Sequence, residues 1–157
     1  ANAAKAKASG LNEKQTTLTQ LSRDTSLAPA ARAQATINLE ALTRRFNIAR
    51  DWAVFFEQYP VLLMPNSWER QFPIDDDQRS AERTAQILLA QAPMLSTATL
   101  GLPGLSVPTG LANGLPVGVQ IVSTKFREDR MLAAGEVIER AAGFSALDYL
   151  VSQEKVA

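Results

Sequence analysis

The chain has 157 residues, of which 46% are hydrophobic, and its 16 basic side chains balance 16 acidic ones. Such a length and composition are typical of one globular domain, and the even charge disfavours nucleic acid and anionic membranes as partners. The absence of Cys and His excludes a Cys nucleophile, a His base, disulfide bonds and the usual zinc or iron ligands, and we predict no cofactor and no metal.

Residues 1–19, rich in Ala, Lys, Thr and Asn, predict either a frayed helix or a flexible arm. Residues 1–10 lack the apolar core of a secretory signal, and no run reaches the roughly 18 apolar residues that cross a bilayer. With the lack of Cys, this predicts a cytoplasmic protein. The first residue is Ala1, which fits processing or a start inside a longer polypeptide.

A long helix is predicted from Pro29 to about Tyr59, because Ser26 and Pro29 suit a helix start and Pro60 ends it. Its apolar face recurs every three or four residues. Seven of the ten aromatic residues lie between Phe46 and Phe72, and we interpret them as one core face because no basic stripe is interleaved with them. The face consists of Leu39, Leu42, Phe46, Ala49, Ala53 and Phe56.

The run 61–64, Val-Leu-Leu-Met, predicts a short strand buried on both faces and closed by Pro65. A long loop follows, ending in Asp75, Asp76 and Asp77. These carboxylates lack the Gly and the final Glu of a calcium loop, so we predict that they cap the next helix.

That helix is predicted at 81–91, with Ala85, Leu88 and Leu89 on its inner face, and Pro93 separates it from a short turn to Leu100. Strands are predicted at 105–107 and 117–122, joined by a tight hairpin turn at Asn113-Gly114. A last helix spans 127–142 and ends at Gly143. Its predicted apolar stripe consists of Met131, Leu132, Gly135, Ile138 and Ala142.

Three apolar strands need cover on both faces, and the few helices supply only part of it. Each large apolar side chain left in water forfeits roughly 1.5–3 kcal/mol, against a net stability of about 5–15 kcal/mol. We therefore predict that residues 1–157 form a single partial domain that packs against more protein. The fold class is α/β, with helices packed on part of a mixed β-sheet.

Three segments in order resemble the amidase signature family. They are the aromatic helix end with Val-Leu-Leu-Met-Pro at 61–65, the glycine-rich stretch Leu100 to Val122, and the final helix from Phe126 to Glu139, covering about residues 50–142. The resemblance implies the C-terminal piece of an α/β/α sandwich. It also implies an enzyme that hydrolyses a carboxylic amide to an acid and ammonia or an amine.

The resemblance implies that a nucleophilic Ser, a bridging Ser in a cis peptide and a Lys perform the chemistry. All three lie upstream in the family, the two serines in a Gly/Ser-rich stretch that this chain lacks. Ser123, Thr124 and Lys125 are interpreted as a solvated loop, because successive strand side chains point to opposite faces. No catalytic residue is carried over, and the chain alone is predicted to be inactive.

By the same resemblance, Thr109, Gly110 and Asn113 are candidates for binding the acyl part of the substrate, the alternative being that all three are turn residues. Trp68 and Phe72 line a substrate channel or pack in the core or loop. The expected partners are a small amide and the upstream part of the polypeptide or a complementary chain, with a homo-oligomer as a further option. The alternative function is a small non-enzymatic α/β module for binding or assembly.

Overall fold

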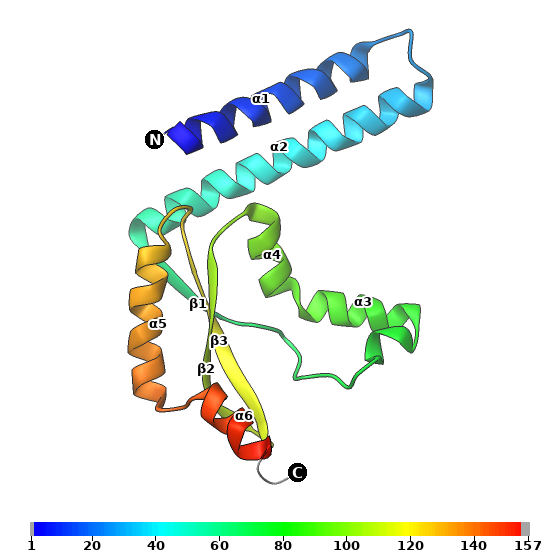
Figure 1. Cartoon of the computed structure of the whole chain (residues 1–157). Helices are drawn as coiled ribbons and strands as arrows, with labels where there is room; N and C mark the ends of the chain where they lie inside the picture. Colours follow the sequence, from blue (N-terminus) through cyan, green and yellow to red (C-terminus); the bar gives the residue numbers. More distant parts are fainter. Residues whose placement is uncertain (1, 155–157) are drawn as a thin grey trace. The chain divides into compact units, whose positions relative to one another are not determined.

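The computed structural model describes residues 2–154, with the side chains of residues 12–151 (Figure 1). The chain divides into two compact units, Ala1–Asp51 and Trp52–Ala157. None of the helices among the described residues is long and apolar enough to cross a membrane. The elements in chain order are α1 (Asn2–Arg23), α2 (Pro29–Gln58), β1 (Val61–Pro65), the 3₁₀ helix η1 (Asp76–Gln78), α3 (Ala81–Ala90), α4 (Ala92–Leu100), β2 (Gly104–Ala112), β3 (Leu115–Ser123), α5 (Glu128–Ala142) and α6 (Ala146–Glu154).

The first unit contains α1 and most of α2. Residues 2–19 are helical, so the flexible-arm alternative is not what the structure shows. Between the two helices, the carboxylate of Asp24 accepts hydrogen bonds from the backbone N–H and the hydroxyl of Ser26, at 2.9 and 2.6 Å. This local turn ends one helix and leads into Pro29, where α2 begins as predicted.

The last part of α2 belongs to the second unit and carries an aromatic cluster. The rings of Trp52, Phe55, Phe56 and Tyr59 pack in pairs with centroids 5.0–5.6 Å apart. Phe56 is 2% exposed, whereas Tyr59 at the helix end is 50% exposed. The core interpretation therefore holds for Phe56 and weakens toward the end of the helix.

A three-stranded sheet forms the centre of the second unit. The strand order is β1-β3-β2, and both pairings are antiparallel. The predicted strands are all present, and both hairpin strands are longer than predicted because pairing continues on either side of a bulge. The α/β class is confirmed, and a mixed sheet would need strands beyond these three.

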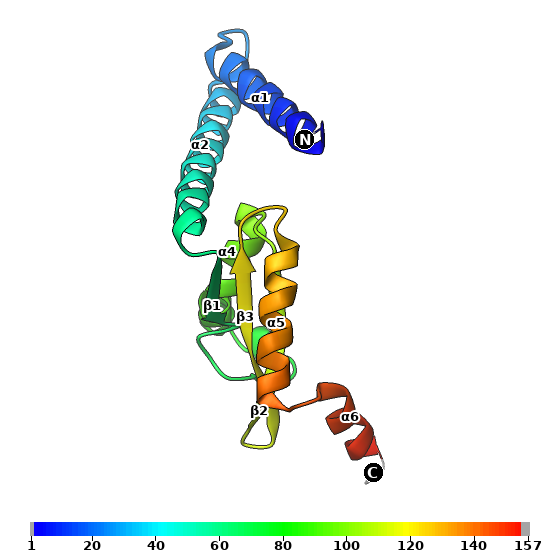
Figure 2. The ribbon, with the colours of Figure 1, turned by 90° about the vertical axis from the view of Figure 1, so that its left-hand side faces the viewer.

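One face of the sheet packs against α5, which runs along the strands in Figures 1 and 2. Val107, Ile121 and Met131 are at most 5% exposed and form the core there. Gly135 faces this core so closely that a Cβ atom at this position would lie 2.6 Å from Leu105 Cδ2. The absence of a side chain at Gly135 thus lets helix and sheet approach closely.

The other face of the sheet meets α4 through polar groups. Gln120, which neighbours Ile121 and so points to the opposite face, is 6% exposed. Its Nε2 donates to Thr97 Oγ1 of α4 at 3.2 Å. Its cross-strand neighbours are Met64 and Ser106.

Many large apolar side chains in the second unit remain in contact with solvent, as predicted from the scarcity of helices. The prediction is wrong in detail for two helices: in α3, Ile87 and Ala90 are buried while Leu88 and Leu89 are 53% and 73% exposed. In α5, Leu132 is 61% exposed. The chain therefore covers most of the predicted apolar stripe of α5, including Met131 and Gly135, but leaves the predicted inner residues of α3 exposed.

Candidate functional site

The hairpin of β2 and β3 carries the three predicted substrate-binding residues. Pro108 pairs with Gly118 and Gly110 pairs with Val117, so Thr109 is the extra residue of a β-bulge. Gly110 has a φ of 149°, and the Thr109 hydroxyl donates to the Val117 carbonyl oxygen at 3.4 Å. The bulge aims Thr109 differently from its neighbours along the strand, and its hydroxyl oxygen retains the capacity to accept a hydrogen bond.

The hairpin turn lies at Asn113-Gly114, as predicted. Both residues have positive φ angles, 55° and 78°, and the flanking residues Ala112 and Leu115 pair directly. These angles suit a two-residue hairpin turn. The Asn113 side chain is exposed. Because the bulge at Thr109 and Gly110 lies only a few residues before the turn, Asn113 and the bulge residues lie at the same end of the hairpin.

Two segments distant in sequence are attached to this end of the hairpin. The Tyr149 hydroxyl of α6 donates to the Gly114 carbonyl oxygen at 2.7 Å. The Gln71 side-chain amide, from the loop after β1, donates to the Pro116 carbonyl oxygen. Sequence reasoning missed both contacts, because no local pattern links residues 35 and 45 positions apart.

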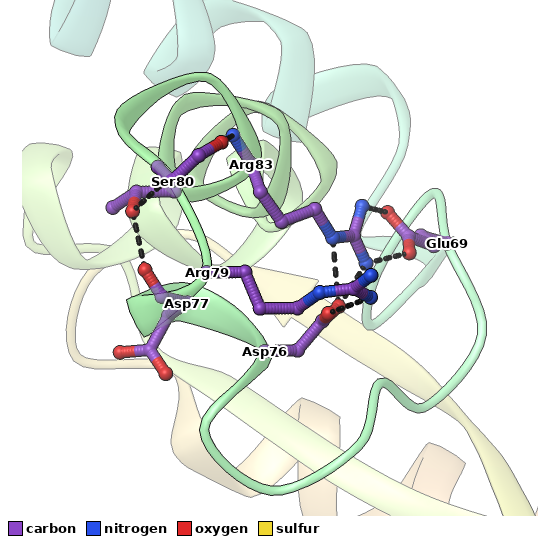
Figure 3. A network of polar contacts seen from close by, with 7 residues as sticks. Glu69, Asp76, Asp77, Arg79, Ser80 and Arg83 are labelled. Carbon is purple, nitrogen blue, oxygen red and sulfur yellow. Dashed lines mark hydrogen bonds and ion pairs between the residues drawn. The ribbon is translucent and has the colours of Figure 1, made fainter.

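The loop that contains Gln71 is anchored to α3 by an ion-pair network (Figure 3). Arg83 Nε donates to Asp76 Oδ2 at 2.7 Å, and Arg83 Nη1 donates to Glu69 Oε2 at 3.1 Å. Arg79 Nη1 approaches Asp76 Oδ1 at 3.0 Å. The hydrogen bond from Arg83 lowers the pKa of Glu69, and those from Arg83 and then Arg79 lower the pKa of Asp76.

This network corrects the prediction that Asp75, Asp76 and Asp77 cap the next helix. Ser80 is the N-cap of α3, and its hydroxyl oxygen accepts from the Arg83 N–H at 3.1 Å. Asp76 is 3% exposed and directed at the guanidinium groups. A serine with good capping geometry was available closer to the helix, and the buried carboxylate was needed to pair the arginines.

Trp68 and Phe72 lie in the same loop, and their side chains are 68% and 37% exposed. Core packing is therefore wrong for both residues. The loop backbone is nevertheless fixed, since the Trp68 N–H and the Ser67 hydroxyl both bond to the Ala90 carbonyl oxygen, at 2.8 and 3.2 Å. The network and these bonds hold two aromatic side chains at the surface.

The Ser-Thr-Lys sequence at the end of β3 is placed differently from the prediction. Ser123 is fully buried, not part of a solvated loop, because β3 extends to this residue and pairs it with Val61. Its hydroxyl donates to the Pro60 carbonyl oxygen at 2.7 Å. A hydroxyl held in this way joins two chain segments, and we assign Ser123 a structural role.

The arrangement of the hairpin, the loop and α6 therefore offers hydrogen-bonding groups on a braced scaffold. Thr109 and Asn113 supply short polar side chains, and a Cβ atom built at Gly110 or Gly114 would meet nothing within 4 Å, so the backbone is open on that side. Such groups orient a ligand, and they do not by themselves break a bond. No residue among those described is assigned as a nucleophile or a base.

Comparison with known proteins identifies the family. The family model described as Amidase matches residues 5–132. The indoleacetamide hydrolase of Bradyrhizobium japonicum is 38% identical over 109 residues, which are 69% of this chain and 23% of that protein. A glutamyl-tRNA(Gln) amidotransferase subunit from Rhodospirillum rubrum is 37% identical over 108 residues, 68% of this chain and 21% of that protein.

The structural comparison agrees with the sequence comparison. The crystal structure of a glutamyl-tRNA(Gln) amidotransferase subunit from Thermotoga maritima matches with a TM-score of 0.52 and 26% identity, over 70% of this chain and 22% of that one. The chain thus spans about a fifth of the length of these relatives. The match over most of the chain establishes that it belongs to the amidase family.

Proposed function

We propose that this chain forms the C-terminal part of an amidase that hydrolyses a carboxylic amide to the acid and ammonia or an amine. Family membership over residues 5–132 is the observation that supports this proposal most directly. A relative named indoleacetamide hydrolase supports an amide as the substrate class. The proposal treats residues 1–157 as one partial domain and places the protein in the cytoplasm, which the absence of cysteine favours.

In this proposal the nucleophilic Ser, the bridging Ser and the Lys lie on the remaining part of the polypeptide or on a complementary chain. Thr109, Gly110 and Asn113 contribute to the pocket for the acyl part of the substrate. The bulge and the turn support this role because they place these residues at one end of a braced hairpin. Trp68 and Phe72, exposed in the neighbouring loop, are proposed to line the entrance for the substrate.

A hybrid enzyme tests the function. The segment of the Bradyrhizobium japonicum indoleacetamide hydrolase that matches this chain is replaced by the corresponding residues of this chain, and release of ammonia from indole-3-acetamide is measured. The hybrid is expected to hydrolyse the amide, and the 157-residue chain alone is expected to release none. Turnover by the isolated chain, or a folded hybrid without activity, contradicts the proposal.

A substitution at the turn separates substrate binding from turn geometry. Asn113→Gly in the hybrid keeps the positive φ angle available and removes the side-chain amide. Loss of one hydrogen bond to the substrate, about 1 kcal/mol, is expected to raise KM roughly fivefold. The melting temperature is expected to stay unchanged. An unchanged KM shows that Asn113 is only a turn residue.

A further inference from the structure

The two edges of the three-stranded sheet differ in how well they are protected. Strand β1 forms one edge, and among residues 2–154 its backbone hydrogen bonds run only to β3. Its sequence is Val-Leu-Leu-Met-Pro, without charge or bulge, and Pro65 stands at its end. Leu63 in its middle is 56% exposed. An apolar, unbulged edge of this kind readily pairs with another strand.

Strand β2 forms the opposite edge and has the features of a true sheet edge. Pro108 in its middle has no N–H to offer to a further strand. The bulge at Thr109 interrupts its regular pairing pattern. Proline and bulges are devices by which proteins prevent further strands from adding to a sheet. A continued sheet would therefore grow from β1.

The position of α5 supports the same asymmetry. This helix packs most extensively on β2, less on the central strand β3 and least on β1. As a result, Ile121 on β3 is fully buried, whereas its cross-strand neighbour Leu63 on β1 is mostly exposed on the same face. A helix that covers a sheet of only three strands would be centred on the middle strand. The off-centre position fits a sheet that continues past β1.

We propose that the outer edge of β1, at residues 61–64, is the docking site for a strand of the remaining amidase polypeptide. The inference deepens the proposed function and rests on it. Free backbone N–H and C=O groups on an apolar strand select an extended, apolar segment as the partner. The docking strand is assigned to the remaining polypeptide because this chain spans about a fifth of the length of its relatives, and the larger part of such a domain lies outside it. Pro60 and Pro65 limit the pairing to about four residues.

Two exposed leucines on opposite edges provide a matched test. Leu63→Lys places a charge beside the β1 edge, and Leu111→Lys, at a residue 47% exposed on β2, is the control. The binding probe is the part of the Bradyrhizobium japonicum indoleacetamide hydrolase outside the segment that matches this chain. Binding to the 157-residue chain is measured by sedimentation velocity. We expect a one-to-one complex that Leu63→Lys weakens at least tenfold and Leu111→Lys leaves within twofold.

Hydrogen exchange on the unmodified chain provides a second measurement that does not depend on a variant. The amides of residues 61–64 that do not bond to β3 are expected to become at least tenfold more protected when the probe binds, and those of β2 are expected to stay the same. The proposal is overturned if no complex forms, if both variants weaken binding equally, or if the chain pairs only with a second copy of itself. A complex that depends on Leu63 but hydrolyses no amide refutes the proposed function and leaves the docking site intact. If the hybrid enzyme with Leu63→Lys hydrolyses the amide as fast as the hybrid without it, the docking site is refuted and the proposed function stands.

Discussion

Gln120 lies in the central strand with only 6% of its surface exposed, and half of its amide group has no partner. Its Nε2 donates to Thr97 Oγ1 at 3.2 Å, and the Thr97 hydroxyl donates its single hydrogen to the Met94 carbonyl oxygen at 2.8 Å. Because Thr97 can then only accept from Gln120, the amide orientation is fixed. Gln120 Oε1 is buried without a hydrogen bond.

Replacing Gln120 with Met, an apolar side chain of similar length, is therefore expected to stabilise the chain. The substitution removes a buried unsatisfied acceptor, which costs about 1–3 kcal/mol, and loses one neutral hydrogen bond worth about 0.5–1.5 kcal/mol. The Thr97 hydroxyl keeps its bond to Met94, so no new group is left unpaired. The net expectation is a gain of about 1 kcal/mol in the free energy of unfolding, or roughly 2–4 °C in melting temperature.

Urea denaturation of the 157-residue chain measures this change, with Gln120→Glu as the matched control. Glu has nearly the same shape but buries an ionisable group and loses the donor to Thr97, so it is expected to destabilise the chain. The reasoning is refuted if Gln120→Met lowers the free energy of unfolding by about 1 kcal/mol or more. That result would show that Oε1 accepts a hydrogen bond in solution.

Three further tests probe separate contacts, and two of them compare a pair of substitutions. Gly118→Ala is expected to cost about 1–3 kcal/mol in the free energy of unfolding, because its Cβ would lie 2.4 Å from a backbone oxygen. Gly104→Ala is expected to cost less, since its closest contact, at 2.9 Å, is the end of a side chain. Equal losses in urea denaturation would contradict this order. Arg83 lowers the pKa of Asp76 in the folded state, so its stabilisation is present above the unfolded pKa of about 3.9 and is lost as the pH falls below that value. Asp76→Asn should flatten the acid limb of melting temperature against pH, and Asp77→Asn, whose carboxylate lies outside the network (Figure 3), should leave it unchanged. Tyr149→Phe removes the hydroxyl bonded to Gly114 and should cost about 0.5–1.5 kcal/mol and speed hydrogen exchange near the turn; unchanged exchange would show that α6 does not brace the hairpin.

The parts of the fold that depend on neighbouring residues were predictable from the sequence. Pro29 and Pro60 delimit α2 because proline is favoured in the first turn and cannot continue a helix. Asn113-Gly114 defines the hairpin turn because both residues accept positive φ angles. In each case one residue's backbone preference decides the outcome, and no distant partner has to be known.

The parts that depend on distant partners were not predictable. Asp76 was interpreted as a helix cap, but its partners are arginines and its neighbour in the network is Glu69, which only the folded loop brings close. Ser123 was interpreted as part of a solvated loop because it lies at a strand end, whereas its hydroxyl donates to the Pro60 carbonyl oxygen, 63 positions away in the sequence. A polar side chain can cap a helix, form an ion pair or make a buried hydrogen bond, and the sequence alone does not identify its partner.

The exposed leucines of α3 and the open edge of β1 have one physical explanation. The apolar pattern of the sequence indicates which face of a segment is suited to burial. The exposed fractions in the structure show how much of that face this chain itself covers. At Leu63, Leu88 and Leu89 the two differ, since each is at least 53% exposed on an element that was predicted to be covered. At Ile121, in the core beneath α5, they agree. The same mismatch occurs at Leu132 on α5, which is 61% exposed. The β1 side of the sheet and the outer faces of α3 and α5 are therefore where the rest of an amidase domain is expected to pack.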